Sequence, residues 1–243
     1  MSVRVLVLAV VLIGCNADID EPWELDHDRI IAVRAEPPGI EPGEQAQIDV
    51  LLGYEALPVE ERSPDFAQVV SPESLANTLS FDGAHWVVTA PSEARINQAR
   101  GELGLLPDAP VPLRIGIAVA WPTPVASPEG MNGFAATKVV WLGQEGINPP
   151  INGLSIGGVE PEVGAEIVFS KDETVKTRLS VEADDGSDIV NWLTSCGTMH
   201  DFDLATSAYV TVGAEDRVEG QFALVLRDEL GGVSWRVWSC RAE

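Results

Sequence analysis

Short runs in which apolar and polar residues alternate, separated by turns rich in glycine and proline, dominate this chain of 243 residues. The clearest runs are 29–35, 45–52, 113–121, 177–183 and 233–240. A period of two puts successive side chains on opposite faces of an extended strand, as in a half-buried sheet. Hydrophobic residues make up 45% of the chain, which is enough for a packed core. The pattern predicts an all-β protein.

One segment departs from this rhythm. Pro91 stands where the first turn of a helix tolerates proline, and Ile96, Ala99 and Leu103 follow at helical spacing. We therefore predict one short helix, from about Ser92 to Leu105, in the first half of the chain.

The strand pattern begins twice along the chain. Gly158-Val159-Glu160-Pro161 echoes Gly39-Ile40-Glu41-Pro42, and each half ends in a strand that carries tryptophan. A segment rich in glycine and proline, 143–153, separates the halves. Two β-sandwiches of about 100 residues each account for this arrangement. We expect domain 1 over residues 29–145 and domain 2 over residues 146–243.

Two short motifs resemble immunoglobulin-like (Ig-like) modules. The opening of a strand, Pro38-Gly39 and a second strand resembles the start of many bacterial Ig-like domains. The final hairpin, with Arg227-Asp228-Glu229-Leu230-Gly231-Gly232 between two strands, resembles the last hairpin of polycystin-type (PKD) and related modules. These resemblances imply two tandem Ig-like domains. The second departs from the antibody pattern, because Trp192 precedes both of its cysteines.

The first fifteen residues have the form of a secretory signal. Arg4 precedes an unbroken apolar run, 5–13, which is followed by Gly14 and Cys15. The run is shorter than the roughly 20 apolar residues that span a bilayer. Leu12-Ile13-Gly14-Cys15 resembles the lipobox of bacterial lipoproteins, which implies removal of residues 1–14, a diacylglycerol on the sulfur of Cys15 and an acyl chain such as palmitate on its amine. The alternatives are an ordinary signal peptide and an N-terminal membrane anchor.

The residues after Cys15 bear on location. Asn16 stands where lipoproteins retained at the inner membrane carry aspartate, so the resemblance implies the outer membrane or the cell surface, with the periplasmic face as an alternative. Residues 15–28 are acidic and aperiodic, and we expect them to form a tether. Trp23 is the one large aromatic residue there, and it would dock on the first domain or at the lipid interface.

Charge and anchoring limit the partners. The formal net charge of −23 repels the phosphate backbone, so nucleic acid is not an expected partner. We expect contact with the membrane through the lipid on Cys15. An envelope or extracellular protein or glycan would be the second partner.

Two cysteines remain after lipidation. Cys196 and Cys240 form an even pair in an oxidising compartment, which predicts a disulfide. Two buried free thiols are the alternative. A zinc site is not expected, because the chain has no CxxC motif and no paired histidines.

Catalytic and metal motifs are weak. Gly153-Leu154-Ser155-Ile156-Gly157 matches the G-x-S-x-G elbow of α/β-hydrolases, and His200 follows it in the right chain order. The elbow requires a helix directly after the serine, whereas here Gly158, Pro161 and Gly164 follow. Asp184, Asp185 and Asp188 share one turn and are weak candidates for calcium, because ordinary turn formation is the simpler explanation. We expect no cofactor.

The sequence leaves two functional hypotheses. The first is a non-enzymatic, lipid-anchored envelope protein that serves in binding, adhesion or scaffolding. The second is a secreted hydrolase whose site is assembled from loops. A convergent group of nucleophile, base and orienting residue would favour the hydrolase.

Overall fold

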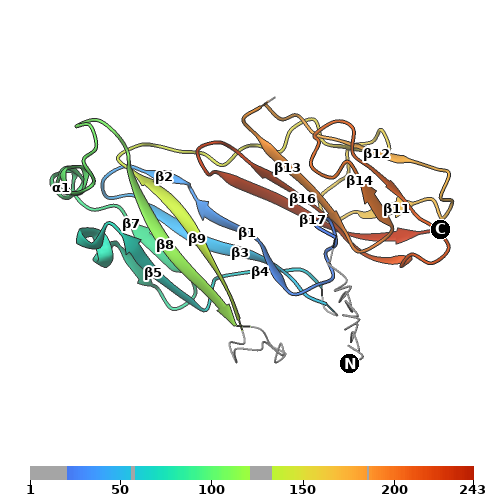
Figure 1. The fold of residues 1–243 in the computed structure, drawn as a ribbon, viewed down its shortest axis with the longest axis horizontal. Helices are drawn as coiled ribbons and strands as arrows, with labels where there is room; N and C mark the ends of the chain where they lie inside the picture. Colours follow the sequence, from blue (N-terminus) through green and yellow to red (C-terminus); the bar gives the residue numbers. More distant parts are fainter. Residues whose placement is uncertain (1–20, 56–57, 121–132, 185) are drawn as a thin grey trace, which may run out of the picture.

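The computed structural model describes residues 21–55, 58–120, 133–184 and 186–243. These residues form two β-sandwiches that follow one another along the long axis of the molecule, with a single short α-helix in the first (Figure 1). The prediction of an all-β protein with two tandem Ig-like sandwiches is confirmed.

Domain 1 consists of two sheets packed face to face. The first contains β1 (Arg29–Glu36), β3 (Gln45–Gly53), β7 (Trp86–Thr89) and β6 (Leu79–Phe81), with β4 (Glu60–Arg62) paired to β3. The second contains β2 (Gly39–Ile40), β9 (Gly133–Leu142), β8 (Val111–Ala120) and β5 (Phe66–Ser71). Alternate residues of the predicted strands, such as Ile48, Val50, Leu113 and Ile115, fill the core between them.

The predicted helix is present as α1 (Glu93–Leu103), and Ile96 and Ala99 face the core. Gly104 ends it in the left-handed region at φ 66°, and the backbone N–H groups of Gly104 and Leu105 reach back to the carbonyls of Gly101 and Arg100. A 3₁₀ helix, η1 (Glu73–Thr78), lies between β5 and β6.

Domain 2 repeats the two-sheet arrangement. One sheet contains β11 (Glu166–Phe169), β17 (Val233–Ala242), β16 (Glu219–Arg227) and β13 (Ile189–Thr194). The other contains β10 (Ser155–Ile156), β12 (Thr177–Ser180), β15 (Tyr209–Thr211) and β14 (Thr198–His200). The ring of Phe222 lies 5.9 Å, between centroids, from each of Phe169, Trp192 and Trp238, and these rings form the centre of the core.

A third apolar cluster joins the two domains. It combines residues from the N-terminal segment and from one sheet of each sandwich: Leu25, Ala32, Leu51, Leu193, Ala223, Val225, Val233 and Trp235. The strand β16 contributes side chains on both of its faces. Phe222, Leu224 and Leu226 belong to the core of domain 2, whereas Ala223 and Val225 belong to the interdomain cluster. Burial on both faces explains why residues 222–226 are apolar without alternation.

The N-terminal segment differs from the predicted tether. Residues 1–20, including the first part of the tether predicted over 15–28, lie outside the described residues. From residue 21 the chain is packed: Leu25 is 2% exposed, and its N–H donates to the carbonyl of Thr194 at 3.1 Å. Trp23 packs against the core of domain 2, not domain 1. Two apolar side chains and paired backbone groups outweigh the acidic composition that predicted a free segment.

We predict that Trp235→Ala uncouples the two domains. The indole is 8% exposed in the interdomain cluster, and truncating a buried tryptophan costs about 3–5 kcal/mol. Urea unfolding followed by circular dichroism should change from one transition to two. Trp86→Ala, within domain 1, is the control and should lower stability without separating the domains. A single transition retained in Trp235→Ala would contradict the prediction.

Candidate functional site

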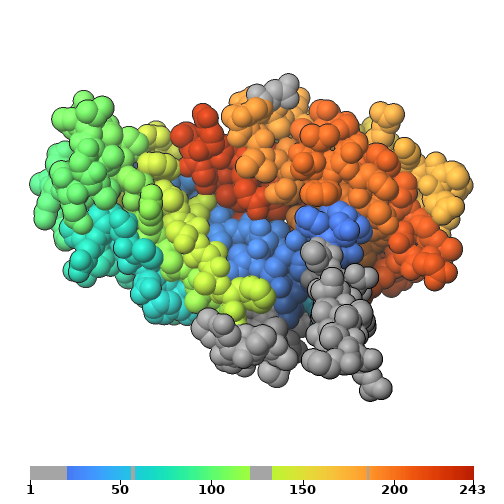
Figure 2. Space-filling view, in the orientation of Figure 1, coloured from blue at the N-terminus to red at the C-terminus, as the bar shows by residue number. Residues whose placement is uncertain are grey.

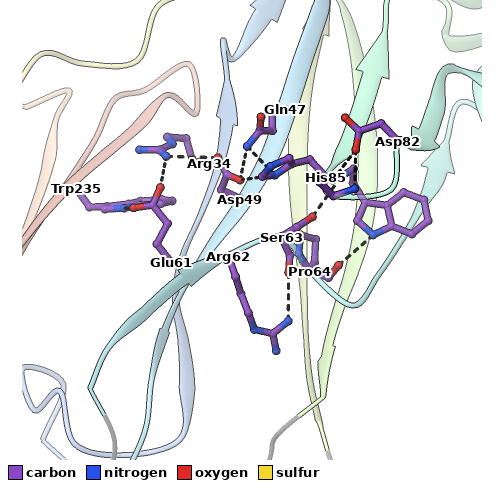
Figure 3. A network of polar contacts seen from close by, with 12 residues as sticks. Arg34, Gln47, Asp49, Glu61, Arg62, Ser63, Pro64, Asp82, His85 and Trp235 are labelled. Atoms are coloured by element: carbon purple, nitrogen blue, oxygen red, sulfur yellow. Dashed lines mark hydrogen bonds and ion pairs between the residues drawn. The ribbon is translucent and has the colours of Figure 1, made fainter.

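A network of polar contacts crosses the domain junction beside Trp235 (Figure 3). The guanidinium of Arg34 on β1 lies 4.1 Å from the centre of the Trp235 ring and 2.5 Å from Oε1 of Glu61 on β4. The indole N–H of Trp235 donates to the other oxygen of Glu61 at 2.8 Å. Cation, carboxylate and indole therefore form a closed triangle between the domains.

The same network continues across domain 1. Asp49 on β3 accepts hydrogen bonds from Arg34 at 3.4 Å and from Gln47 at 2.8 Å, and Gln47 also contacts Nδ1 of His85 at 2.9 Å. These residues line a hollow of about 510 Å³. Its cations already have carboxylate partners, because Arg34 pairs with Asp49 and Glu61 while Arg62 pairs with Glu60 and Asp65. Because the arginines that line the hollow are already paired with carboxylates, the hollow is better suited to stabilising the domain junction than to binding a ligand.

A second groove, also of about 510 Å³, has a different character. Its lining consists of Arg29–Val33 of β1, Phe134–Val139 of β9, and Arg227, Gly231 and Val233 of the last hairpin. Figure 2 shows these three segments together, with β1 in blue, β9 in yellow-green and the red hairpin beside them. Because consecutive residues of β1 and β9 line it, the groove follows the edges of the two strands.

Lys138 is the unusual residue of this interdomain groove. In β9 the residues Val140 and Leu142 face the core, and a period of two places Lys138 on the same inward face. The residue is 6% exposed, and its ammonium donates to the carbonyl of Gly231 at 2.5 Å. Burial lowers the pKa of Lys138 to about 8, although the charge of Asp228 acts in the opposite direction.

Arg227 adds a second cation to the interdomain groove. It ends β16, donates to the carbonyl of Ile31 at 2.8 Å and hydrogen-bonds the side-chain oxygen of Asn191. Burial lowers the pKa of Arg227. In the part of the chain that the structure describes, no carboxylate lies within 4.0 Å of the charged nitrogens of Lys138 or Arg227. Two desolvated cations without an acidic partner are suited to bind an anionic group.

The sequence reasoning missed this groove. The available signal was a lysine at an inward position of an alternating strand, Phe134-Ala135-Ala136-Thr137-Lys138-Val139-Val140. Its partner Arg227 comes from the hairpin motif about 90 residues later, so only the packing of the two domains brings the two cations together.

The cysteine pair is brought together in the core of domain 2. Cys196 and Cys240 are both buried there, and their thiols are hydrogen-bonded to one another. The predicted disulfide is not formed in this structure, where both are free thiols. The hydrogen bond to Cys196 and burial raise the pKa of the Cys240 thiol. Cys196 and Cys240 are therefore close together, as a disulfide requires, while the disulfide itself stays a prediction.

Two of the calcium candidates, Asp184 and Asp188, are joined by the hydrogen bonds of an ordinary turn. The carboxylate of Asp188 accepts the backbone N–H of Asp184 at 2.8 Å, and the N–H of Asp188 returns to the carbonyl of Asp184. Asp185 lies outside the described residues. Among the residues that are described, no three histidine, cysteine, aspartate or glutamate side chains gather in a way that would hold a metal ion.

The G-x-S-x-G motif is not a nucleophile elbow. Ser155 lies in the two-residue strand β10, which pairs with β12, and the chain continues into left-handed turns at Gly157 and Gly158 instead of a helix. His200 is stacked on Tyr209 at 4.5 Å between ring centres and contacts Thr211.

The signal peptide and Cys15 lie outside the described residues. Within the described ranges, no helix has the length and apolar character needed to cross a membrane.

Comparisons with known proteins give only distant likenesses. No protein-family model matches the chain, and no curated protein matches it significantly. The titin domains Z1Z2, solved in complex with telethonin, align over 87% of this chain and 96% of theirs, with 11% identity and a TM-score of 0.23. The two tandem V-type regions of the chitin-binding protein VCBP3 align over 86% and 98%, with 12% identity and a TM-score of 0.31. Human mucin-like protocadherin EC1-2 aligns over 87% and 98%, with 12% identity and a TM-score of 0.25.

We predict that Lys138 makes stability rise with pH. Between pH 8 and 10.5 the unfolded chain keeps the lysine proton while the folded chain releases it, so unfolding becomes costlier. The rise should approach about 3 kcal/mol across this window, and the destabilisation is fully present below it. Urea unfolding at pH values below, within and above the window measures it. Lys138→Met should lose the rise, whereas Lys171→Met, at an exposed position, should retain it.

The cysteine pair provides a separate prediction. In protein exported to an oxidising compartment, Cys196 and Cys240 should form a disulfide that closes a loop of roughly 44 residues and adds about 4 kcal/mol to stability. Unfolded mature protein should react with a thiol reagent only after reduction. Two equivalents of reactive thiol without reductant would show that the bond does not form.

Proposed function

We propose that this chain is an exported protein, anchored in the cell envelope by lipid on Cys15, that serves as a non-enzymatic binding or scaffold module. The observation that carries the proposal is the fusion of two sandwiches into one unit by the interdomain cluster around Trp235. Independent domains on a flexible linker would present two separate surfaces, whereas a fused pair presents a continuous one.

Several contacts at the junction support a rigid pair. Asn148, in the segment between the domains, donates to the carbonyl of Ala35 at 2.9 Å and accepts the N–H of Val233 at 2.7 Å. The indole N–H of Trp141 donates to the carbonyl of Leu230 at 2.6 Å. The connecting segment is therefore bonded to both domains.

The interdomain groove supports a binding role. It places the buried Lys138 and the half-buried Arg227 at the junction of the domains, and the fixed junction holds both cations in position. No observation of comparable weight favours the secreted hydrolase, since Ser155 lies in a strand–turn context.

The anchor and the location rest on the sequence. An N-terminal signal followed by Cys15 supports lipidation, and two or more acyl chains hold a protein stably on a membrane. Asn16 supports the outer membrane or the cell surface as the destination. A protein or glycan of the envelope or of the surroundings is the proposed partner.

The anchor test is fractionation of cells that express the intact chain or Cys15→Ser. Wild type should partition into detergent, whereas Cys15→Ser should remain uncleaved or appear in the soluble periplasmic fraction. Cys196→Ser leaves the lipobox intact and is the control. If Cys15→Ser still partitions like wild type, the lipid anchor is disproved.

A further inference from the structure

We infer that the interdomain groove between β1 and β9 binds an extended segment of a partner protein, which adds as a strand to the edge of β9 and places a carboxylate on Lys138 and Arg227. The inference deepens the binding role proposed above and rests on it. It commits to a peptide strand with an acidic side chain.

No described strand pairs with the outer backbone edge of β9 between residues 133 and 140. The opposite edge pairs with β8 from Gly133 to Leu142, and β2 pairs with the outer edge at Trp141 and Leu142. The N–H of Trp141 donates outward, to the carbonyl of Pro38 at 2.9 Å. Since the β8 pairing has no register shift, the period of two points the N–H and C=O groups of Val139, Thr137 and Ala135 to the same outer edge.

The facing wall of the groove is also a strand edge. Among the described strands, β1 lies at the edge of its sheet and pairs with β3 alone. Residues Arg29–Val33 of this strand line the groove opposite Phe134–Val139, with Ile31, Val33 and Ala136 among them. An extended segment placed here would gain main-chain hydrogen bonds from β9 and apolar contacts from both walls, the usual basis of strand addition.

The positive charge of the groove lining favours a bound segment that carries a carboxylate. The ammonium of Lys138 has three donors, of which one is used on the carbonyl of Gly231. Asp228 acts on it electrostatically without an ion pair, and Arg227 and Arg29 add positive charge to the same lining. A single carboxylate would relieve this repulsion, whereas a polyanion would be opposed by the net charge of −23.

The backbone edge favours a peptide over a fatty acid. Unpaired N–H and C=O groups require hydrogen-bonding partners when they are covered. An alkyl chain cannot supply them, so a fatty acid in this groove would satisfy the cations and leave the edge of β9 unpaired. A peptide strand satisfies both.

The experiment uses the unlipidated mature chain with Cys15→Ser and an acetylated, amidated peptide, Val-Thr-Asp-Thr-Val, compared with its Asn counterpart. Isothermal titration should show the Asp peptide binding about tenfold more tightly than the Asn peptide, as expected for a charge-assisted contact. Lys138→Met should abolish this preference, and Lys171→Met should keep it. Binding of the Asp peptide should also weaken as the pH rises past 8, because Lys138 becomes neutral.

A matched pair of variants at Thr137 tests the main-chain hydrogen bonds between β9 and the peptide. Thr137 is exposed on the edge of β9, where proline is tolerated, and Thr137→Pro removes the outward N–H that Thr137→Val retains. We expect Thr137→Pro to abolish binding of both peptides and Thr137→Val to preserve it. Retained folding is checked by circular dichroism.

Three outcomes would overturn the inference. The first is equal binding of the Asp and Asn peptides, and the second is binding unaffected by Thr137→Pro. The third is displacement of the Asp peptide by laurate or by self-association of the chain, which would assign the groove to a lipid or a second copy. None of these outcomes depends on Cys15, so failure here is distinct from failure of the anchor.

Discussion

Packing of Trp235 between the sandwiches fixes the two domains against one another. The indole belongs to an apolar cluster drawn from both domains, and the guanidinium of Arg34 lies over its ring. Glu61 bonds both of these groups, so the charges are satisfied where the domains meet. The junction that results also closes one side of the interdomain groove. Without it, Lys138 and Arg227 would lie on separate bodies.

The interdomain groove has a cost in stability. A lysine that is 6% exposed, with one carbonyl as its bonded partner, destabilises the folded state while it is charged. Buried ionisable groups of this kind mark functional sites more often than ordinary core positions. A carboxylate from a partner would offset that cost, which makes the unbound molecule receptive to one class of ligand.

Much of the fold was predictable from local pattern. The alternating runs around Ile48 and Ile115 became central strands, and the stripe of Ile96 and Ala99 became a helix capped by Gly104. The predicted tether failed from residue 21 onward, because Trp23 and Leu25 find apolar contacts that composition does not reveal. The sequence argued against Ser155 as a nucleophile and favoured turn formation for the aspartates, and the structure places Ser155 in a strand and Asp188 in a turn. The cysteine pair is close but unbonded.

The β class, the two-part organisation and the single helix followed from local sequence patterns, since periodicity and turn residues act over short distances. The sequence also supplied the proposed anchor at Cys15, which is a property of the chain's first residues. Long-range packing was needed to show that a third apolar cluster joins the two domains and that Lys138 and Arg227 line the same groove. Those contacts join residues about 90 positions apart through the faces of two sheets, and no local pattern encodes which faces will meet.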